Sequence, residues 1–224
     1  MILQFMIITL LSCEFSQPQI DQTKGSKIVF FGDSITELGV KPRGYVTLIE
    51  NHFKNAGSDV QIVGAGVSGN RVPDLLQRVD RDVLALKPFI VIVYIGINDV
   101  WHFSMKNLHG TPKEEFRKGL IELVKRIREV GAQVVLCTPS VIGEKKNAEN
   151  PQDTMLDEYA EITRSVAAEQ EAALCDLRQS FIQYERMHNI DGVDRGLLTY
   201  DGVHLSDEGN RLVADELIKL LDSQ

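Results

Sequence analysis

From residue 27 onward, apolar runs of strand length alternate with stretches whose apolar residues recur at helical spacing. The runs predict five strands, at 28–31, 60–63, 89–95, 133–138 and 172–176. The helical stretches lie between and after them, near 43–55, 72–86, 113–130, 153–170, 178–188 and 207–222. Strand segments such as "IVIVYI" and "VVLC" are continuously apolar, which is typical of strands covered on both faces.

This order of elements indicates an α/β protein. Strands joined by helices through short connections form right-handed crossover units, and therefore one parallel sheet with helices on both sides. The five strands predict a flavodoxin-like three-layer α/β/α sandwich that forms a single domain over residues 27–224. Ligands of such sheets bind outside the carboxyl ends of the strands, so the loops there are expected to carry the chemistry.

The chain begins differently. Its first eleven residues are apolar apart from Gln4 and Thr9, a run too short for a bilayer, which takes about 20 residues, but typical of a signal-peptide core. The following "LLSC" resembles the cleavage box of bacterial lipoprotein signals, with Cys13 as the lipidated residue. We expect a leader at 1–13, a polar tether at 14–26 and an exported protein that is periplasmic, at the cell surface or membrane-anchored. A disordered N-terminus is the alternative, since no Lys or Arg precedes the apolar run.

Composition narrows the range of partners. The chain has 224 residues, 43% hydrophobic and 25% charged, as in an ordinary soluble domain. The net charge is −8 and Lys and Arg form no dense cluster, which argues against a nucleic-acid partner. Cys137 and Cys175 lie near the ends of apolar runs and are expected in the core. The sequence leaves the oligomeric state undetermined.

The stretch "GAGVSG", residues 64–69, matches the glycine fingerprint of dinucleotide-binding turns. A dinucleotide site normally places this turn after the first strand, with an acidic residue about 20 positions further on. Here the turn follows the second predicted strand, and residues 84–97 contain no Asp or Glu. We therefore expect the glycines to serve another purpose, and we expect no cofactor.

Two other loops carry residue types suited to nucleophilic catalysis. "FFGDSIT" places Ser34 just beyond the first strand, and "DGVHL" places Asp201 three residues before His204, ahead of the last helix. A serine hydroxyl becomes a nucleophile when a base takes its proton, and the base needs a third group to fix its tautomer. An Asp-x-x-His loop can supply both partners at the crevice where the first strand ends.

Four short blocks, "GDSIT", "GVSGN", "GIND" and "DGVH", occur in this order along nearly the whole predicted domain. In this the chain resembles the SGNH, or GDSL, family of serine hydrolases. The resemblance implies the SGNH hydrolase fold, with Ser34 as nucleophile, His204 as general base and Asp201 as its orienting partner. It also implies an oxyanion hole made by the backbone N–H groups of Ser34 and Gly69 and the side-chain amide of Asn98. Gly69 would turn its N–H into the site without a Cβ in the way, and an Asn amide can donate where Asp or Leu could not.

Neighbouring polar residues are expected to have structural roles. Gly64 departs from the family, in which the second block commonly begins with Asn, and this leaves open how the loop is braced. Asn70 stands where a G-x-S-x-G nucleophile elbow requires glycine, so Ser68 is expected to be a loop hydrogen-bonder. Asp33 and Asp99 flank candidate residues and are expected to brace turns rather than form a two-carboxylate pair.

The histidines and one long connection complete the candidates. We expect no metal site. The spacing typical of metal ligands with Cys or carboxylates is absent around four histidines, His52, His102, His109 and His188. His102 follows Trp101 directly after the third block and is expected near the site entrance. The segment 140–153 is long for a connection in a compact domain. We expect a solvated loop there, with a lid as the alternative.

The predicted reaction is hydrolysis of a carboxylic ester through an acyl-serine intermediate. "SGNRVPDLLQR", "KPFIVIVYIGINDVW" and "TPSVIGE" resemble bacterial acetylxylan and related carbohydrate deacetylases of this family. This implies short-chain esters on a small molecule or polysaccharide, with O-acetyl carbohydrate as the expected substrate. Trp101 and Tyr200 could wall an acyl pocket and stack on a sugar. Two alternatives stay open: a lysophospholipase or thioesterase for longer acyl chains, and a non-catalytic carbohydrate- or lipid-binding module.

Overall fold

The structure, a computed structural model, describes residues 26–146 and 149–222, so the predicted leader and Cys13 lie outside the described residues. Its centre is a five-stranded sheet whose neighbouring strands all run parallel, in the order β2-β1-β3-β4-β5. The strands are β1 (Lys27–Gly32), β2 (Gln61–Gly66), β3 (Ile90–Tyr94), β4 (Gln133–Cys137) and β5 (Ala173–Cys175). The predicted parallel sheet is confirmed.

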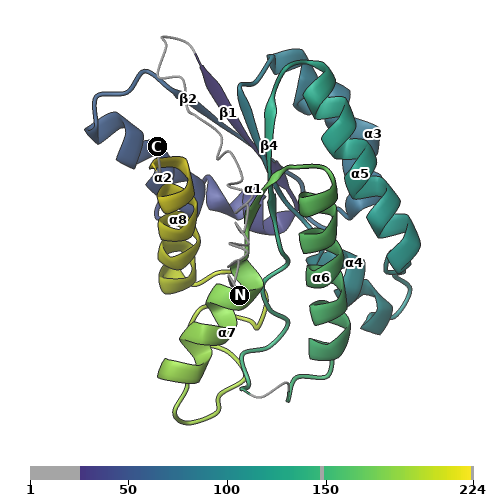
Figure 1. Cartoon of the computed structure of the whole chain (residues 1–224). Helices are drawn as coiled ribbons and strands as arrows, with labels where there is room; N and C mark the ends of the chain where they lie inside the picture. Colours follow the sequence, from purple (N-terminus) through teal and green to yellow (C-terminus); the bar gives the residue numbers. More distant parts are fainter. Residues whose placement is uncertain (1–25, 147–148, 223–224) are drawn as a thin grey trace, which may run out of the picture.

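Helices cover both faces of this sheet, as Figure 1 shows. On one side α2 (Tyr45–Asn55) contacts α8 (Asp207–Asp222), and on the other α5 (Lys113–Glu129) contacts both α3 (Val72–Asp82) and α6 (Asp153–Glu169). The remaining helical segments are α1 (Ser34–Gly39), η1 (Leu84–Leu86), α4 (Ile97–Trp101), η2 (His102–Ser104) and α7 (Leu177–His188). The arrangement is the predicted three-layer α/β/α sandwich.

The strand ends agree with prediction within one residue except at β2, which continues through Gly64 to Gly66. Two short helices, α1 and α4, replace what the sequence predicted as loops. Neither is long enough to show helical periodicity. Asp33 starts α1 by accepting the backbone N–H of Ile35 on its side chain, and such a cap satisfies one of the free donors of a helix N-terminus.

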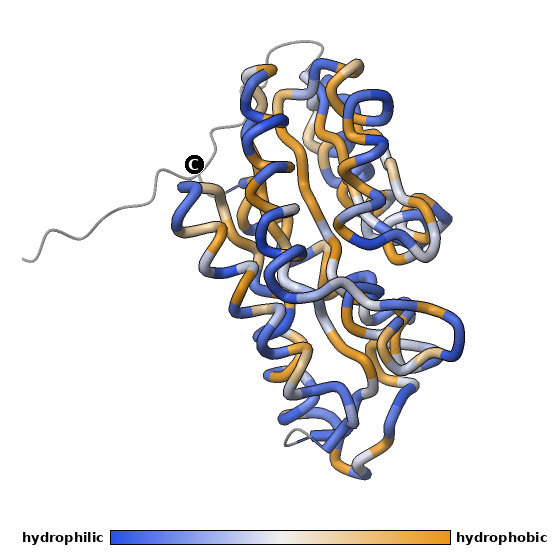
Figure 2. The backbone as a smooth tube through the Cα atoms, turned by 90° about the vertical axis from the view of Figure 1, so that its right-hand side faces the viewer, coloured by the Kyte–Doolittle hydropathy of each residue, from blue (hydrophilic) through white to orange (hydrophobic). Residues whose placement is uncertain are grey.

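The core lies between the helix layers. Every residue of β3 is at most 1% exposed, and the tube in Figure 2 shows apolar strands inside helices of mixed hydropathy. The helices turn one apolar face inward, as Val72, Leu75 and Val79 of α3 do. Cys137 and Cys175 are free and buried in this core, as predicted.

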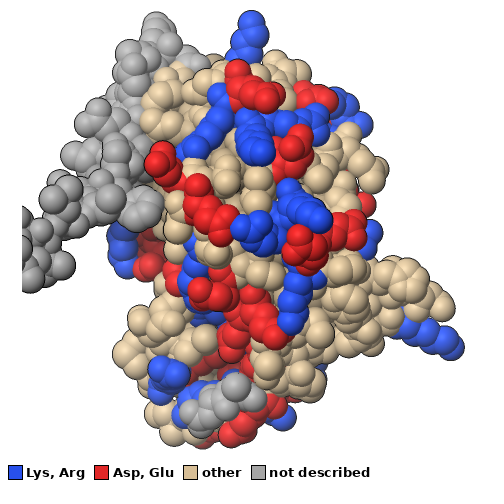
Figure 3. Space-filling model, turned by 45° about the vertical axis from the view of Figure 1, so that its right-hand side comes forward, with Lys and Arg blue, Asp and Glu red and all other residues tan. Residues whose placement is uncertain are grey.

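The surface carries charges of both signs. Over the face that comes forward in Figure 3, Lys and Arg alternate with Asp and Glu rather than forming a basic patch. Ion pairs on this surface join α5 to α6, for example Lys113 to Glu158 and Arg117 to Glu169. Within residues 26–146 and 149–222, no helix has both the length and the apolar character needed to cross a membrane.

Candidate active site

Ser34 is the first residue of α1, directly after the carboxyl end of β1. Its position follows from the local sequence: the strand ends at Gly32, and Asp33 caps the helix that begins at the serine. The backbone N–H of a first helical residue has no intrahelical acceptor and is available to an anion. The fold thus presents both the hydroxyl and the N–H of Ser34 at the sheet edge.

His204 lies between Ser34 and Asp201. Its Nε2 is 2.9 Å from Ser34 Oγ, and its Nδ1 is 2.7 Å from Asp201 Oδ2. The other oxygen, Asp201 Oδ1, accepts the backbone N–H groups of Val203 and His204. With the proton on Nδ1, Nε2 is free to accept the serine proton. The three residues predicted from distant loops therefore form one hydrogen-bonded chain.

The ionisation of Asp201 suits this arrangement. Burial opposes its charge, but the hydrogen bonds from the His204 side chain and from two backbone N–H groups outweigh burial and lower the pKa of Asp201. An ionised Asp201 holds the histidine in the tautomer described above and favours the imidazolium that forms when the base takes a proton.

A buried carboxylate braces the segment before Asp201. Glu144 is 0% exposed, and its oxygens accept the backbone N–H groups of Leu197, Leu198 and Thr199. The sequence did not single out Glu144, although an acidic residue directly after the apolar "SVIG" was a possible signal.

The segment around Glu144 differs from the expected solvated loop. Ser140 and Val141 are fully buried, and the Gly143 N–H donates to the Gly202 carbonyl at 2.7 Å. The prediction of a solvated loop is therefore wrong for residues 140–144. This first part of the connection fills the interior because its polar groups are satisfied by the segment that carries Asp201.

The predicted oxyanion donors lie at neighbouring strand ends. Gly69 adopts φ +78°, a conformation that favours glycine. A Cβ there would meet no atom within 4 Å, so positive φ rather than steric clearance explains the glycine. The Asn98 amide is 4% exposed, and its Nδ2 donates to the Asn70 carbonyl at 3.0 Å. One N–H of this amide fixes the side chain, and the second remains for a ligand.

Arg78 joins the loops that carry these donors. Its guanidinium reaches from α3 to the carbonyls of Gly32 at 2.6 Å and Ala65 at 3.0 Å, and to Asn70 Oδ1 at 2.6 Å. It also lies over the Phe31 ring, 4.5 Å from the centroid. The carboxyl ends of β1 and β2 are thereby held at a fixed separation. Arg78 was not predicted from the sequence, although an Arg on the otherwise apolar face of a predicted helix signals a buried role.

The departure from the family at Gly64 has a local explanation. A Cβ at this position would meet Val40 Cγ1 at 2.2 Å, so the valine fills the space that a larger residue would need. The turn beyond it is held by Glu37, which accepts both the backbone N–H and the hydroxyl of Ser68. Ser68 is thus a loop hydrogen-bonder, as expected.

Two aromatic side chains flank the histidine. Tyr200 stacks on the His204 ring with centroids 5.7 Å apart, and Trp101 meets it edge-on at 6.4 Å. Tyr200 is 58% exposed, so its outer face is open to a ligand. Both residues predicted to line the site therefore lie beside the base.

Two buried carboxyl groups lie close behind the site. Burial raises the pKa of Asp33 to about 7 and that of Asp99 to about 7. Asp33 accepts from Ile35 and Asp99 from the Val72 N–H, so both brace turns as expected. Neither makes a hydrogen bond to the His204 ring, whose partners are Ser34 and Asp201.

A hollow of about 280 Å³ adjoins Gly69, and we call it the Gly69 hollow. Its wall combines apolar surface with polar side chains and consists of Gly69, Arg71, Asp74, His102, Asn107, Leu108 and His109. His102 lies at this hollow, as predicted for the site entrance, and His109 also lines it. The remaining two candidate histidines lie elsewhere: His52 bonds Asp222 and His188 bonds the Tyr184 carbonyl. In the described part of the chain, no three His, Cys, Asp or Glu side chains are grouped so that they could hold a metal ion.

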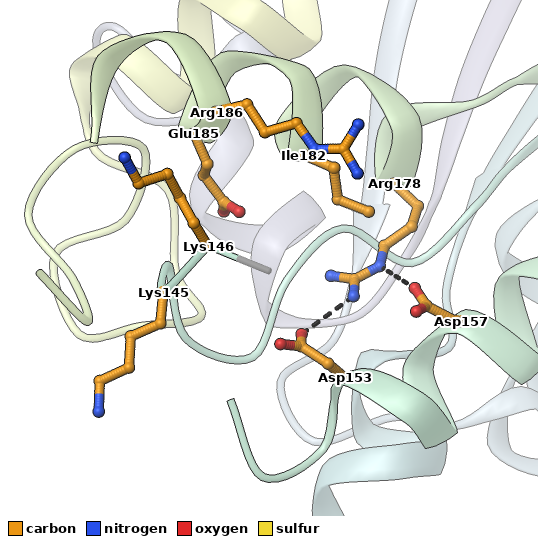
Figure 4. A pocket seen from close by; sticks show the side chains of 8 residues that line it. All are labelled: Lys145, Lys146, Asp153, Asp157, Arg178, Ile182, Glu185 and Arg186. Carbon is orange, nitrogen blue, oxygen red and sulfur yellow. Dashed lines mark hydrogen bonds and ion pairs between the residues drawn. The ribbon is translucent and has the colours of Figure 1, made fainter. Parts of the chain in front are cut away.

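A second hollow, of about 320 Å³, lies between α7 and the start of α6. In Figure 4 the Arg178 guanidinium lies between Asp153 and Asp157, while Lys145 and Lys146 extend away from it. Arg178 donates to both carboxylates and to the Ser140 carbonyl, so each of its nitrogens is used within the fold. This cluster ties α7 to α6.

Known proteins share this architecture and sequence. Residues 30–212 match the family model of the GDSL-like lipase/acylhydrolase family. The crystal structure of an acetyl xylan esterase, AlAXEase, is similar with a TM-score of 0.84 and 40% identity, covering 86% of this chain and 98% of that one. An acetylxylan esterase of Geobacillus stearothermophilus is 29% identical over 214 residues, 87% of this chain and 93% of its own. An uncharacterized lipoprotein of Bacillus subtilis, YqeF, is 25% identical over 214 residues, 83% of this chain and 85% of its own.

Proposed function

The chain belongs to the GDSL-like lipase/acylhydrolase family and is a carboxylic ester hydrolase, and from this premise we propose that it removes O-acetyl groups from carbohydrate through an acyl-serine intermediate. The observation that carries the proposal is the unbroken chain from Ser34 Oγ through His204 to Asp201, with contacts of 2.9 and 2.7 Å. Hydroxyl, base and orienting carboxylate are all present at hydrogen-bond distance.

In the first half of the reaction, Ser34 Oγ attacks the ester carbonyl carbon while His204 Nε2 takes the hydroxyl proton. The carbonyl oxygen becomes an anion that the N–H groups of Ser34 and Gly69 and the second N–H of Asn98 stabilise. When the tetrahedral intermediate collapses, the bond to the alcohol oxygen breaks and His204 returns its proton to that oxygen. The alcohol leaves, and the acetyl group remains on Ser34.

Water completes the cycle by the same route. His204 takes a proton from water, whose oxygen attacks the acetyl carbonyl, and the same three donors hold the second oxyanion. Collapse breaks the bond to Ser34 Oγ, His204 protonates the serine, and acetate leaves. Asp201 stays ionised throughout and favours the imidazolium in both halves.

The carbohydrate substrate rests on three supports. Relatives that cover most of this chain are named as acetylxylan esterases. The exposed Tyr200 beside His204 offers a flat apolar face on which a sugar ring can stack. Several residues around the Gly69 hollow, among them Arg71, Asp74 and His102, carry polar groups that can hydrogen bond to the hydroxyls of a sugar.

A panel of esters tests the substrate. We expect activity on acetylated xylo-oligosaccharides and a steep fall in kcat/KM on nitrophenyl esters longer than butyrate. Activity on octanoate or on lysophospholipid that equals activity on acetate would favour the lysophospholipase or thioesterase alternative and contradict the proposal.

The nucleophile has its own test. Ser34→Ala should abolish turnover while the fold stays intact, and a fluorophosphonate probe should label the wild-type protein at Ser34. Ser68→Ala is the matched control, since Ser68 lies on the neighbouring loop and bonds Glu37. An inactive Ser68 variant beside an active Ser34 variant would show that the wrong serine has been assigned. A protein that no fluorophosphonate labels would be a non-catalytic binding module.

We also propose that the protein is exported and lipidated at Cys13. The apolar leader with its "LLSC" box supports this, as does the similarity to a protein named as a lipoprotein. Expression of the full chain in bacteria fed radiolabelled palmitate should label the wild type and leave Cys13→Ala unlabelled. Equal labelling of both would exclude Cys13 as the acceptor.

A further inference from the structure

The Gly69 hollow adjoins residues placed at the proposed reaction centre. Gly69, whose N–H is a proposed oxyanion donor, forms one of its walls. The chain continues from Trp101, which contacts the His204 ring, into His102, which forms another wall. The hollow therefore shares Gly69 with the proposed oxyanion hole and reaches the residue that follows Trp101.

The hollow is a built site rather than a gap in a mobile loop. Arg71 is the N-cap residue of α3, and its Nη1 donates to the His109 carbonyl at 2.7 Å, which ties the 102–110 segment to the helix. Asp74 accepts the Arg71 backbone N–H at 2.9 Å and lies 3.4 Å from its guanidinium. These contacts hold opposite walls of the hollow in a fixed relation.

His102 is the polar group that this framework leaves unused. The residue is 8% exposed, yet its ring has no hydrogen-bond partner within residues 26–146 and 149–222. Burial, together with the positive charge of Arg71, lowers the pKa of His102, so the imidazole is neutral at pH 7. A neutral ring offers one donor and one acceptor, which is the pattern that a hydroxyl group can satisfy on both sides.

Size indicates which half of the ester occupies this space. An acetyl group extends only one methyl beyond the reacting carbonyl and does not need a hollow of about 280 Å³. The alcohol half of an acetylated sugar is a hydroxylated ring, which needs a space of this order with a few polar groups placed around it. We propose that the Gly69 hollow is the subsite for the sugar ring that carries the acetyl group, and that His102 determines specificity by hydrogen bonding a hydroxyl of that ring.

The inference rests on the proposed function and is tested by a ratio of activities. For each protein, kcat/KM is measured on acetylated xylobiose and on 4-nitrophenyl acetate, which has no sugar hydroxyl. His102→Phe keeps a ring of similar size but removes both nitrogens. Loss of one hydrogen bond in a buried site predicts that the sugar-to-nitrophenyl ratio falls about tenfold. His102→Gln, which retains a donor and an acceptor, should keep more of the ratio than the Phe variant.

A second measurement needs no turnover of a sugar ester. Xylobiose should inhibit hydrolysis of nitrophenyl acetate competitively, and its inhibition constant should rise about tenfold in His102→Phe. His52→Phe is the matched control, because His52 lies on α2 and bonds Asp222 on the surface. The control should leave both the ratio and the inhibition constant as in the wild type.

Three outcomes would overturn the inference. A ratio unchanged in His102→Phe excludes His102 as a specificity residue while leaving the proposed function intact. A changed preference between acetate and butyrate in that variant assigns the hollow to the acyl group. A wild-type protein that hydrolyses nitrophenyl acetate but no acetylated sugar contradicts the carbohydrate substrate itself, and the subsite with it.

Discussion

At the scale of single residues, the amide of Asn98 uses its two N–H bonds differently. One donates to the Asn70 carbonyl at 3.0 Å and fixes the plane of the amide, which leaves the other aimed by the same contact. Asn98→Ala should lower kcat about 10²–10³-fold with little change in KM, because the lost donor acts mainly on the transition state. Steady-state kinetics on nitrophenyl acetate provide the measurement. A variant that weakens KM and keeps kcat would contradict the role of Asn98.

Single residues also show which parts of the site can be predicted from sequence alone. Ser34, Asp201 and His204 could be predicted because each lies in a short sequence block whose residues alone indicate nucleophilic catalysis. The roles of Arg78 and Glu144 could not be predicted. Arg78 reaches the Gly32 carbonyl 46 positions away, and the backbone N–H groups that Glu144 accepts lie 53 or more positions away, so these groups become neighbours only in the folded chain. The contacts that position a site are thus harder to predict than the groups that react.

At the scale of elements, the segment 140–144 acts as a brace for the segment that leads to Asp201. We expect Glu144→Gln to destabilise the protein by about 1–3 kcal/mol, because an amide cannot accept from all the donors that the carboxylate satisfies. We also expect kcat to fall about tenfold, since a small displacement of the base costs rate. Urea unfolding and steady-state kinetics measure the two effects.

The control for this variant lies on the same connection. Glu149 is exposed, and Glu149→Gln should alter neither stability nor rate. If Glu144→Gln loses stability but keeps its full kcat under conditions where it is folded, Glu144 supports the fold without positioning the base.

The elements themselves were largely predictable. Long apolar runs and amphipathic stretches located the five strands and six longer helices, because burial on a sheet dictates such patterns. The short helices α1 and α4 escaped prediction because each is too short for a period to appear. Both begin at the carboxyl ends of strands and carry the residues of the site, Ser34 on one and Asn98 on the other.

At the scale of the whole molecule, buried carboxyl groups link stability to pH. The pKa of Asp99 is raised by burial from 3.8 to about 7, so between these values the folded protein holds a proton that the unfolded chain has released. Its contribution to stability is complete below pH 4 and is lost as pH rises to 7, at about 1.4 kcal/mol per pH unit. Asp33 acts in the same direction. The free energy of unfolding should therefore contain a component that declines across this range.

Asp99→Asn should flatten that decline, because the amide resembles the protonated carboxyl and does not titrate. Urea unfolding at pH 4.5, 5.5, 6.5 and 7.5, chosen to span the range between roughly pH 4 and 7, gives the slope for each protein. Asp59→Asn, at an exposed position, should retain the wild-type slope. An identical slope in Asp99→Asn would mean that Asp99 is ionised in the folded state.

Ser34 and His204 are separated by 170 positions along the chain, and this separation affects the order in which parts of the site form during folding. All five strands and Ser34 precede His204 in the chain, so the sheet can form before the imidazole is in place. The protein can then cleave esters only once the last helix, which follows His204, packs against α2, where Asn210 accepts the Tyr45 N–H. During refolding, the onset of turnover would consequently report the docking of this last segment rather than formation of the sheet.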